Sequence, residues 1–359
     1  NMNSKAFLLP AALMIAGNSV ANSKGKKTDK RPNILVILAD DLGYSDLGCY
    51  GSEIHTPNLD KLAQQGVRFN HFYNASRSCP TRASLLTGLY QHQAGIGRMT
   101  FDDNLPGYRG TLSRNAVTIA EVLKESGYTT SMIGKWHVAE TPLRKDQREW
   151  LAHHVYHDTY SDLCHYPVNR GFDSHYGTIY GVVDYFDPFS LVEGEVPVKE
   201  VPEGYYITQA LSDRAAEEVT EYAKDDKPFF MYLAYTAPHW PLHALPEDIE
   251  KYKDTYKVGW EAIRNARYER QKQLGIFPGM DDFLSERQFK DRWEDNAHAE
   301  WDARAMAVHA AMIDRMDQGI GQVIDALEKT GQLDNTLILF LSDNGCSNEN
   351  CQNYSPGEN

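Results

Sequence analysis

Four largely apolar runs, the second of them interrupted by hydroxyl residues, constrain the fold of this chain more than any other feature. Each run has the length of a strand, and segments with a helical pattern separate the runs. Continuous apolar runs are typical of parallel strands that are buried on both faces. Together with the intervening helices they predict an α/β fold, in which a mostly parallel central sheet carries helices on both faces. The runs comprise residues 33–39, 128–133, 228–235 and 336–341.

Polar residues of the types that bind metals or transfer protons follow each of these runs. The carboxyl ends of parallel strands meet at one edge of a sheet, where ligands bind, so we expect these side chains to lie together. Adjacent acids in such a place are poorly explained by packing, because buried carboxylates need a partner or a metal. Taken singly, each lysine or histidine has a structural alternative. In chain order the residues are Asp40 and Asp41, Lys135 and His137, His239, and Asp343 and Asn344.

Oxygen ligands of this kind suit calcium or magnesium. The five cysteines show no zinc spacing, which argues against zinc as the metal of this edge. Their odd number leaves at least one of them unpaired. Cys346 and Cys351 could form a disulfide in an oxidising compartment, and scattered buried thiols are the commoner alternative.

A polar loop that turns directly into an apolar helix is predicted over residues 78–88. Pro80 suits the first turn of a helix and Gly88 suits the position after its end. Ser78 is then expected immediately before the helix, where free N–H groups and the helix dipole favour a tetrahedral anion. Arg82 lies one turn further on and can point back at Ser78. The alternative is a serine N-cap on a buried helix.

The stretch Ser78-x-Pro80-x-Arg82, followed by Thr87-Gly88, resembles the signature of the type I sulfatases of the alkaline phosphatase superfamily. Their signature begins with a Cys or Ser that is oxidised to formylglycine, an aldehyde whose hydrate is the nucleophile. One residue separates the first residue of the signature from its proline. Cys79 directly precedes Pro80, so Ser78 is the residue that fits the signature. The resemblance therefore implies a Ser-type sulfatase, matured by a radical maturase. It extends over residues 33–345 and includes the block 134–137, and residues 93–99 and 252–274 resemble the arylsulfatase branch.

This resemblance also assigns roles to the residues of the predicted edge. The divalent cation, calcium or else magnesium, is expected on Asp40, Asp41, Ser78, Asp343 and Asn344. Arg82 and Lys135 would hold the sulfate. The implied reaction hydrolyses an aryl sulfate or a sulfated glycan. Asp343 would be the base for the attack, and His239 would protonate the leaving alcohol. His137 would then take the proton from the second hydroxyl of the formylglycine hydrate, which expels sulfate. Unmodified Ser78 lacks the second hydroxyl and should stall after one sulfation.

Two other functions stay open. A phosphomonoester or phosphodiester hydrolase of the same superfamily could share these residues and would turn over with unmodified Ser78. An inactive remnant or binding module is the second alternative. It is suggested because sulfatases carry a second sulfate-binding lysine and a small C-terminal subdomain after the Asp-Asn-Gly block, whereas no lysine follows Lys329 here and the chain stops at Asn359. We therefore expect a truncated sulfatase domain without its C-terminal subdomain.

The two ends of the chain, one charged segment and the net charge allow further predictions. Residues 1–21 resemble a signal peptide, which predicts a periplasmic or secreted protein, and their apolar run is too short to span a membrane. Residues 22–32 form a basic tether, and residues 33–359 form the predicted catalytic domain. The charged stretch near 246–299 is expected to be an insertion over the site, or else a solvated surface excursion. A net charge of −14 makes nucleic acid an unsuitable partner.

Overall fold

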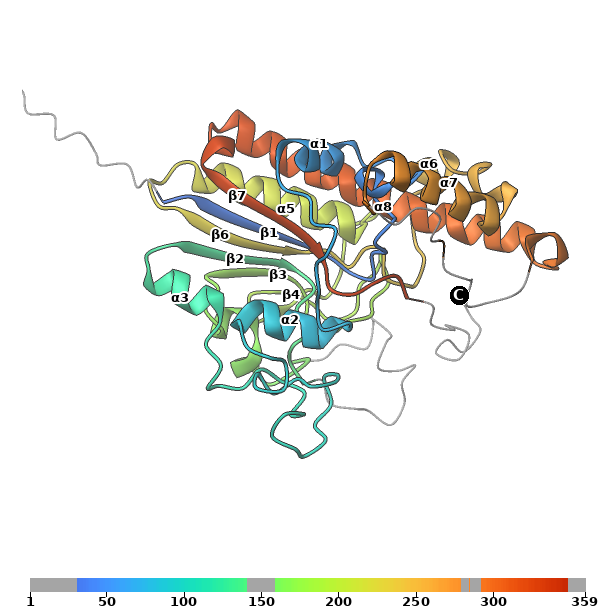
Figure 1. Cartoon of the computed structure of the whole chain (residues 1–359). Coiled ribbons are helices and arrows are strands. Elements are labelled where there is room, and N and C mark those ends of the chain that lie inside the picture. Colours follow the sequence, from blue (N-terminus) through green and yellow to red (C-terminus); the bar gives the residue numbers. More distant parts are fainter. Residues whose placement is uncertain (1–30, 141–158, 279–283, 285–291, 348–359) are drawn as a thin grey trace, which may run out of the picture.

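The structure is a computed structural model that describes residues 31–140, 159–278, 284 and 292–347 (Figure 1). The predicted signal peptide lies outside the described residues, and so do most of the tether, part of the stretch 246–299, and Cys351. Among the described helices, none combines the length and the apolar character that a membrane crossing requires.

A seven-stranded sheet in the order β5-β4-β3-β2-β6-β1-β7 forms the centre of the molecule. The strands β3, β2, β6, β1 and β7 run parallel, and β4 and β5 complete the sheet in antiparallel pairing. All four apolar runs are strands, namely β1, β2, β6 and β7, and the predicted fold class is confirmed. The strands are β1 (Asn33–Ala39), β2 (Thr129–Gly134), β3 (Ser174–Thr178), β4 (Leu191–Glu193), β5 (Val196–Pro197), β6 (Phe229–Ala234) and β7 (Thr336–Ser342).

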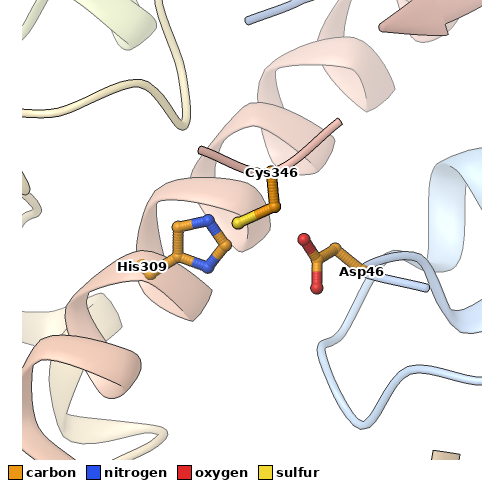
Figure 2. A group of neighbouring side chains, drawn as sticks. All are labelled: Asp46, His309 and Cys346. Atoms are coloured by element: carbon orange, nitrogen blue, oxygen red, sulfur yellow. The ribbon is translucent and has the colours of Figure 1, made fainter. Parts of the chain in front are cut away.

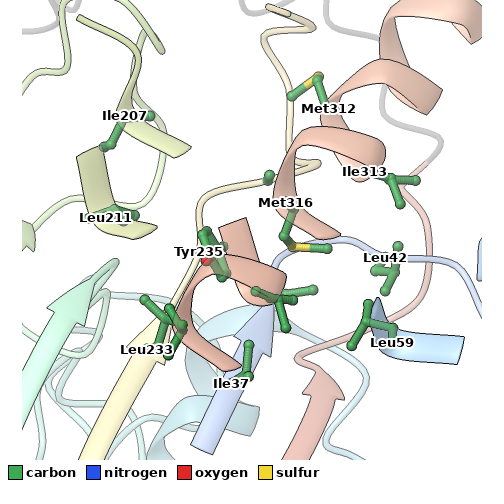
Figure 3. Packing of buried hydrophobic residues seen from close by; sticks show 14 of the residues in the cluster. Ile37, Leu42, Leu59, Ile207, Leu211, Leu233, Tyr235, Met312, Ile313 and Met316 are labelled. Atoms are coloured by element: carbon green, nitrogen blue, oxygen red, sulfur yellow. The ribbon is translucent and has the colours of Figure 1, made fainter. Parts of the chain in front are cut away.

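Helices cover the two faces of this sheet and bury separate apolar clusters. Along β1, Leu35 and Ile37 belong to the cluster beneath α1, α5 and α8, whereas Val36 and Leu38 belong to the cluster beneath α2 and α3. This alternation is the one expected of a strand whose successive side chains point to opposite faces. Figure 3 shows part of the first cluster, to which α8 contributes Met312, Ile313 and Met316. The helices are α1 (Pro57–Gln65), α2 (Ser78–Thr87), α3 (Ile119–Glu125), α5 (Ile207–Tyr222), α6 (Pro246–Glu250), α7 (Trp260–Gln273) and α8 (Ala299–Lys329).

The expectation that 336–341 is buried on both faces was wrong. Among the residues that the structure describes, β7 is the last strand at its end of the sheet and pairs only with β1. Ile338 and Phe340 pack against the cluster beneath α8, but Leu337 and Leu339 are 49% and 44% exposed on the other face. An apolar run shows only that a strand is suited to burial. The strand is buried on both faces only if another element covers each face. Within the described residues no helix covers this face of β7.

Three helix ends show how the local sequence sets helix boundaries. α2 begins at Ser78 with Arg77 as its N-cap, so Ser78 lies in the first turn and neither precedes nor caps the helix, contrary to the prediction and its alternative. Gly88 ends α2 as expected, with a φ of 68° and its N–H bonded to the Ser84 carbonyl at 2.8 Å. Thr118 is the N-cap of α3 and forms a reciprocal capping box with Glu121.

The described part of the charged stretch forms α6 and α7 (Figure 1). α6 packs against α8, and α7 contacts the short turn Thr255–Val258, which also packs against α8. Arg267 of α7 reaches across to the loop that follows β1. Its guanidinium binds Asp46 at 2.5 Å and Glu53 at 2.7 Å. α7 is thereby attached to the loop that carries the first two predicted site residues.

Candidate active site

Backbone hydrogen bonds continue past the strand ends and bring the polar residues to one edge. The Asp40 N–H donates to the Ala237 carbonyl at 3.0 Å, and the Asp343 N–H donates to the Ala39 carbonyl at 3.1 Å. The Lys135 N–H donates to the Ala234 carbonyl at 2.8 Å. The loops after β1, β2, β6 and β7 therefore start from a common line at the carboxyl edge of the sheet.

Asp40 lies at the centre of this edge and is completely buried. One carboxylate oxygen forms an ion pair with the Lys135 ammonium, and the other lies 3.2 Å from Nη2 of Arg82. That second oxygen, Oδ1, has no hydrogen-bond partner among the residues that the structure describes. Burial raises the pKa of Asp40 well above its ordinary value, although Lys135 acts in the opposite direction and the nearby Asp343 adds to the rise.

Asp41 and Asn344 add further oxygen donors beside Asp40. The Asp41 backbone N–H donates to Oδ1 of Asp343 at 3.2 Å, and Nδ2 of Asn344 donates to the Asp41 carboxylate. Asp40, Asp41 and His239 each offer a ligand atom within 4.8 Å of the other two. Three carboxylates and an amide, with one buried oxygen lacking a hydrogen bond, fit a hard divalent cation.

Arg82 connects Ser78 to Asp343. Its Nε donates to Oγ of Ser78 at 3.0 Å and to Oδ2 of Asp343 at 3.1 Å, and Nη2 donates to the same carboxylate oxygen at 2.8 Å. Nη1 is held by the Lys135 carbonyl at 2.9 Å. Burial opposes the ionisation of Asp343, but the positive charges of Arg82 and Lys135 outweigh it and hold the pKa of Asp343 below its ordinary value. Asp343 is therefore an ionised acceptor.

His137 approaches Ser78 from the other side. Its Nδ1 lies 3.3 Å from Oγ of Ser78, and its Nε2 lies 3.2 Å from Sγ of Cys79. Burial lowers the pKa of His137 well below its ordinary value, and Lys135 and Arg82 lower it further, so the ring is neutral. A Cβ at Gly181 would lie 2.2 Å from Cε1 of His137, so only glycine allows this close approach.

His239 faces the acids from the loop after β6. Its Nδ1 lies 2.6 Å from the Trp240 carbonyl and donates to it, which leaves Nε2 directed at Asp41, 3.5 Å from Oδ2. Burial and the charge of Lys135 lower the pKa of His239, and Asp41 opposes them. The buried Tyr185 donates to the Thr236 carbonyl at 2.7 Å and to the His239 carbonyl at 2.8 Å, and so supports this loop.

The structure thus brings every residue of the predicted site into one connected group. It places Ser78 between a guanidinium and a neutral imidazole, and it places the acids beside them. Gly181 and Tyr185 could not be found from the sequence, because the stretch that contains them shows no periodicity and a single glycine or tyrosine carries no motif. The residues in the group are Asp40, Asp41, Ser78, Arg82, Lys135, His137, His239, Asp343 and Asn344.

Comparisons with known proteins identify the family. The sequence model of the sulfatase family matches residues 32–359. An uncharacterized sulfatase of Schizosaccharomyces pombe is 35% identical over 342 residues, which make up 88% of this chain and 58% of that protein. The arylsulfatase of Klebsiella aerogenes is 34% identical over 353 residues, or 96% of this chain and 72% of that enzyme.

A solved structure gives the same result. The crystal structure of Ps i-CgsB in complex with k-i-k-neocarrahexaose superposes with a TM-score of 0.60 at 32% identity, and the match covers 87% of this chain and 58% of that one. This chain therefore spans a little over half the length of that protein and of the yeast relative. The motif at Ser78, the α/β sheet and these matches agree, and the chain belongs to the sulfatase family.

Proposed function

We propose that this chain hydrolyses sulfate monoesters, and that Ser78, once oxidised to formylglycine, is its nucleophilic residue. The observation that carries the proposal is the position of the Ser78 Oγ, 3.0 Å from Nε of Arg82 and 3.3 Å from Nδ1 of His137. A hydrated aldehyde at this residue supplies two hydroxyls, one to attack sulfur and one to release sulfate. Cys79 is a poor candidate for this role, because burial raises the pKa of its thiol to about 12.

The proposed cation is calcium, held by Asp40, Asp41, Asp343, Asn344 and residue 78. Bound there, it would neutralise negative charge on the ester. The donor set supports a hard cation because it consists of carboxylate and amide oxygens. The Oδ1 atom of Asp40, which has no hydrogen-bond partner among the described residues, offers such an ion a buried ligand.

Arg82 and Lys135 supply the local positive charge that an anionic ester needs in a chain with a net charge of −14. Arg82 orients residue 78 and holds Asp343 ionised, so that Asp343 can accept a proton during the attack. Neutral His137 can accept a proton at Nδ1 from an oxygen on residue 78. His239 has Nδ1 fixed on Trp240, so Nε2 is the atom that would pass a proton to the leaving alcohol from the protonated ring, the form that the neighbouring Asp41 carboxylate favours.

The two substrate classes expected from the sequence remain the proposed ones. The relative from Klebsiella aerogenes is named an arylsulfatase, which supports an aryl sulfate. Ps i-CgsB was crystallised with neocarrahexaose, which supports a glycan. The signal peptide at 1–21, export to the periplasm or beyond, and a radical maturase as partner belong to the same proposal.

Co-expression with a radical maturase tests the proposal directly. Mass spectrometry of the Ser78 peptide should show a product lighter by two hydrogens, and the matured chain should release sulfate from nitrophenyl sulfate. Ser78→Ala should remove both signals, whereas Cys79→Ala should keep substantial activity. Turnover of a phosphate ester by the unmodified chain would favour the phosphohydrolase instead. Calcium binding without turnover of either ester by the matured chain would indicate a binding module.

A further inference from the structure

A second group of metal-binding side chains lies beside the candidate active site and shares no residue with it. Asp46 follows β1, His309 lies on α8, and Cys346 follows β7. Each offers one ligand atom, and these atoms all lie within 4.8 Å of one another. Figure 2 shows the imidazole, the thiol and the carboxylate directed toward a common space. Asp46 is buried, His309 is half-buried and Cys346 is exposed.

The loops around this space allow the close approach. The Gly43 N–H donates to Oδ2 of Asp46 at 2.9 Å, which fixes the carboxylate in a tight turn. A Cβ at Gly43 would lie 2.4 Å from that oxygen and 3.2 Å from Cβ of Cys346, so a larger residue here would displace the Asp46 carboxylate and crowd Cys346. The loop after β1 and the loop after β7 therefore have a shared contact at this point.

Arg267 orients the carboxylate of Asp46, and its own positive charge is balanced by a second carboxylate. Its Nη1 binds Oδ1 of Asp46 at 2.5 Å, while Nε and Nη2 bind the two carboxylate oxygens of Glu53 at 2.8 and 2.7 Å. Glu53 therefore neutralises the guanidinium. Hydrogen bonds of this kind from a neighbouring residue are what orients a carboxylate ligand at a metal.

We propose that Asp46, His309 and Cys346 form a zinc site. A thiolate, an imidazole and a carboxylate together suit zinc, whereas calcium takes oxygen ligands and avoids sulfur. Zinc holds a thiolate at about 2.3 Å and an imidazole at about 2.0 Å. Ligand atoms already within 4.8 Å of one another therefore need to approach by only about 1 Å. The exposed side chain of Cys346 has the freedom to do so.

Zinc at this position would join three elements that carry or support the candidate active site. Asp46 belongs to the loop of Asp40 and Asp41, and Cys346 belongs to the loop of Asp343 and Asn344. His309 would attach both loops to the long helix α8. Three protein ligands also leave a fourth position open to water. The site would therefore stabilise the two loops, and its occupancy does not require sulfatase activity or a modified Ser78.

Cobalt(II) is the probe for this site, because cobalt bound to a thiolate gives a charge-transfer band in the near ultraviolet that cobalt on carboxylates lacks. The full chain, reduced and saturated with calcium, is titrated with cobalt and then with zinc. We expect the band to appear and one equivalent of zinc to remove it. Absence of the band would overturn the proposal, since cobalt at Asp40 and Asp41 would not produce it.

Variants assign the band to these residues. Cys346→Ser should abolish it, and His309→Ala should weaken cobalt binding at least about tenfold. Cys164→Ser is the matched control, because Cys164 lies in another group with an acid and a histidine, Asp162 and His165. The control should keep the band. A band that survives Cys346→Ser, or that only Cys164→Ser removes, would contradict the assignment.

Thermal unfolding gives a second readout, independent of the spectrum. Zinc should raise the melting temperature of the parent chain and of Cys164→Ser, because it binds only the folded state. It should leave Cys346→Ser unchanged. An equal rise in Cys346→Ser would show that zinc binds elsewhere and would overturn the proposal.

Discussion

β1 and β7 lie side by side in the sheet and differ in how they are buried. They pair in parallel over their whole length, from Asn33 opposite Thr336 to Ala39 opposite Ser342. β1 lies between two strands, with apolar clusters on both of its faces. β7 has one packed face, and on the other Leu337 and Leu339 are about half exposed. Yet both strands end in acids of the same candidate site.

This difference separates what places a functional residue from what buries a strand. The register sets Ala39 opposite Ser342, so the next residues, Asp40 and Asp343, emerge together whatever covers the strands. Burial depends instead on the elements above and below each strand. The site therefore depends on strand pairing, and the stability of each strand depends on its cover.

The first and largest prediction compares the two acids in the absence of metal. Asp343→Asn should destabilise the chelated protein by about 3–5 kcal/mol, because it leaves the buried Arg82 without the carboxylate that holds it by two hydrogen bonds. Asp40→Asn also removes a buried ion pair, with Lys135, but should cost less, since burial raises the pKa of Asp40 and so already disfavours its ionised form. Denaturant unfolding in EDTA measures both. Equal losses would show that the two strand ends do not differ in this way.

The second prediction compares the strands themselves. Leu35→Ala in β1 should cost about 2–5 kcal/mol, because the side chain is fully buried and leaves a cavity. Leu339→Ala in β7 should cost less than about 1 kcal/mol, because much of that side chain already contacts solvent. The same unfolding assay measures both variants. Similar losses would mean that β7 is covered on its second face in solution.

The sequence predicted the elements that local patterns determine. Largely apolar runs identified β1, β2, β6 and β7, and Gly88 located the end of α2. The meeting of the seven residues that follow strands was expected from one rule about parallel sheets, whereas Ser78 and Arg82 were added from the motif at the start of α2. The start of α2 was placed one residue too late, because the sequence offered Ser78 as a cap whereas Arg77 takes that position in the structure.

Features that depend on distant contacts could not be predicted. Nothing in the run 336–341 shows that β7 is a terminal strand, because strand order is set by the path of the whole chain. Tyr185 supports the His239 loop through two backbone carbonyls, an interaction without a sequence motif. Asp46, His309 and Cys346 come from three separate elements, so their spacing matches no zinc pattern.

The third prediction concerns the cation that would join the two strand ends. Calcium at about 100 times its Kd should stabilise the chain by about 2.7 kcal/mol, and chelation should remove that gain, because the ion binds only the folded state. Asp343→Asn should abolish the response. Leu339→Ala should keep it, since it changes β7 but leaves the acids in place. Calcium-dependent thermal unfolding tests this, and a response retained in Asp343→Asn would exclude that residue as a ligand.

The last and smallest effect is expected on the exposed face of β7. Replacing Leu337 and Leu339 by threonine keeps residues that favour strands while it removes exposed apolar surface. The free energy of unfolding should change by less than about 0.5 kcal/mol per site, as is usual for surface substitutions. Self-association should decrease, because a terminal strand with apolar side chains is prone to pair with other chains. Denaturant unfolding and light scattering measure the two effects. A loss above about 2 kcal/mol, the size expected for core truncation, would show that β7 is buried as fully as β1.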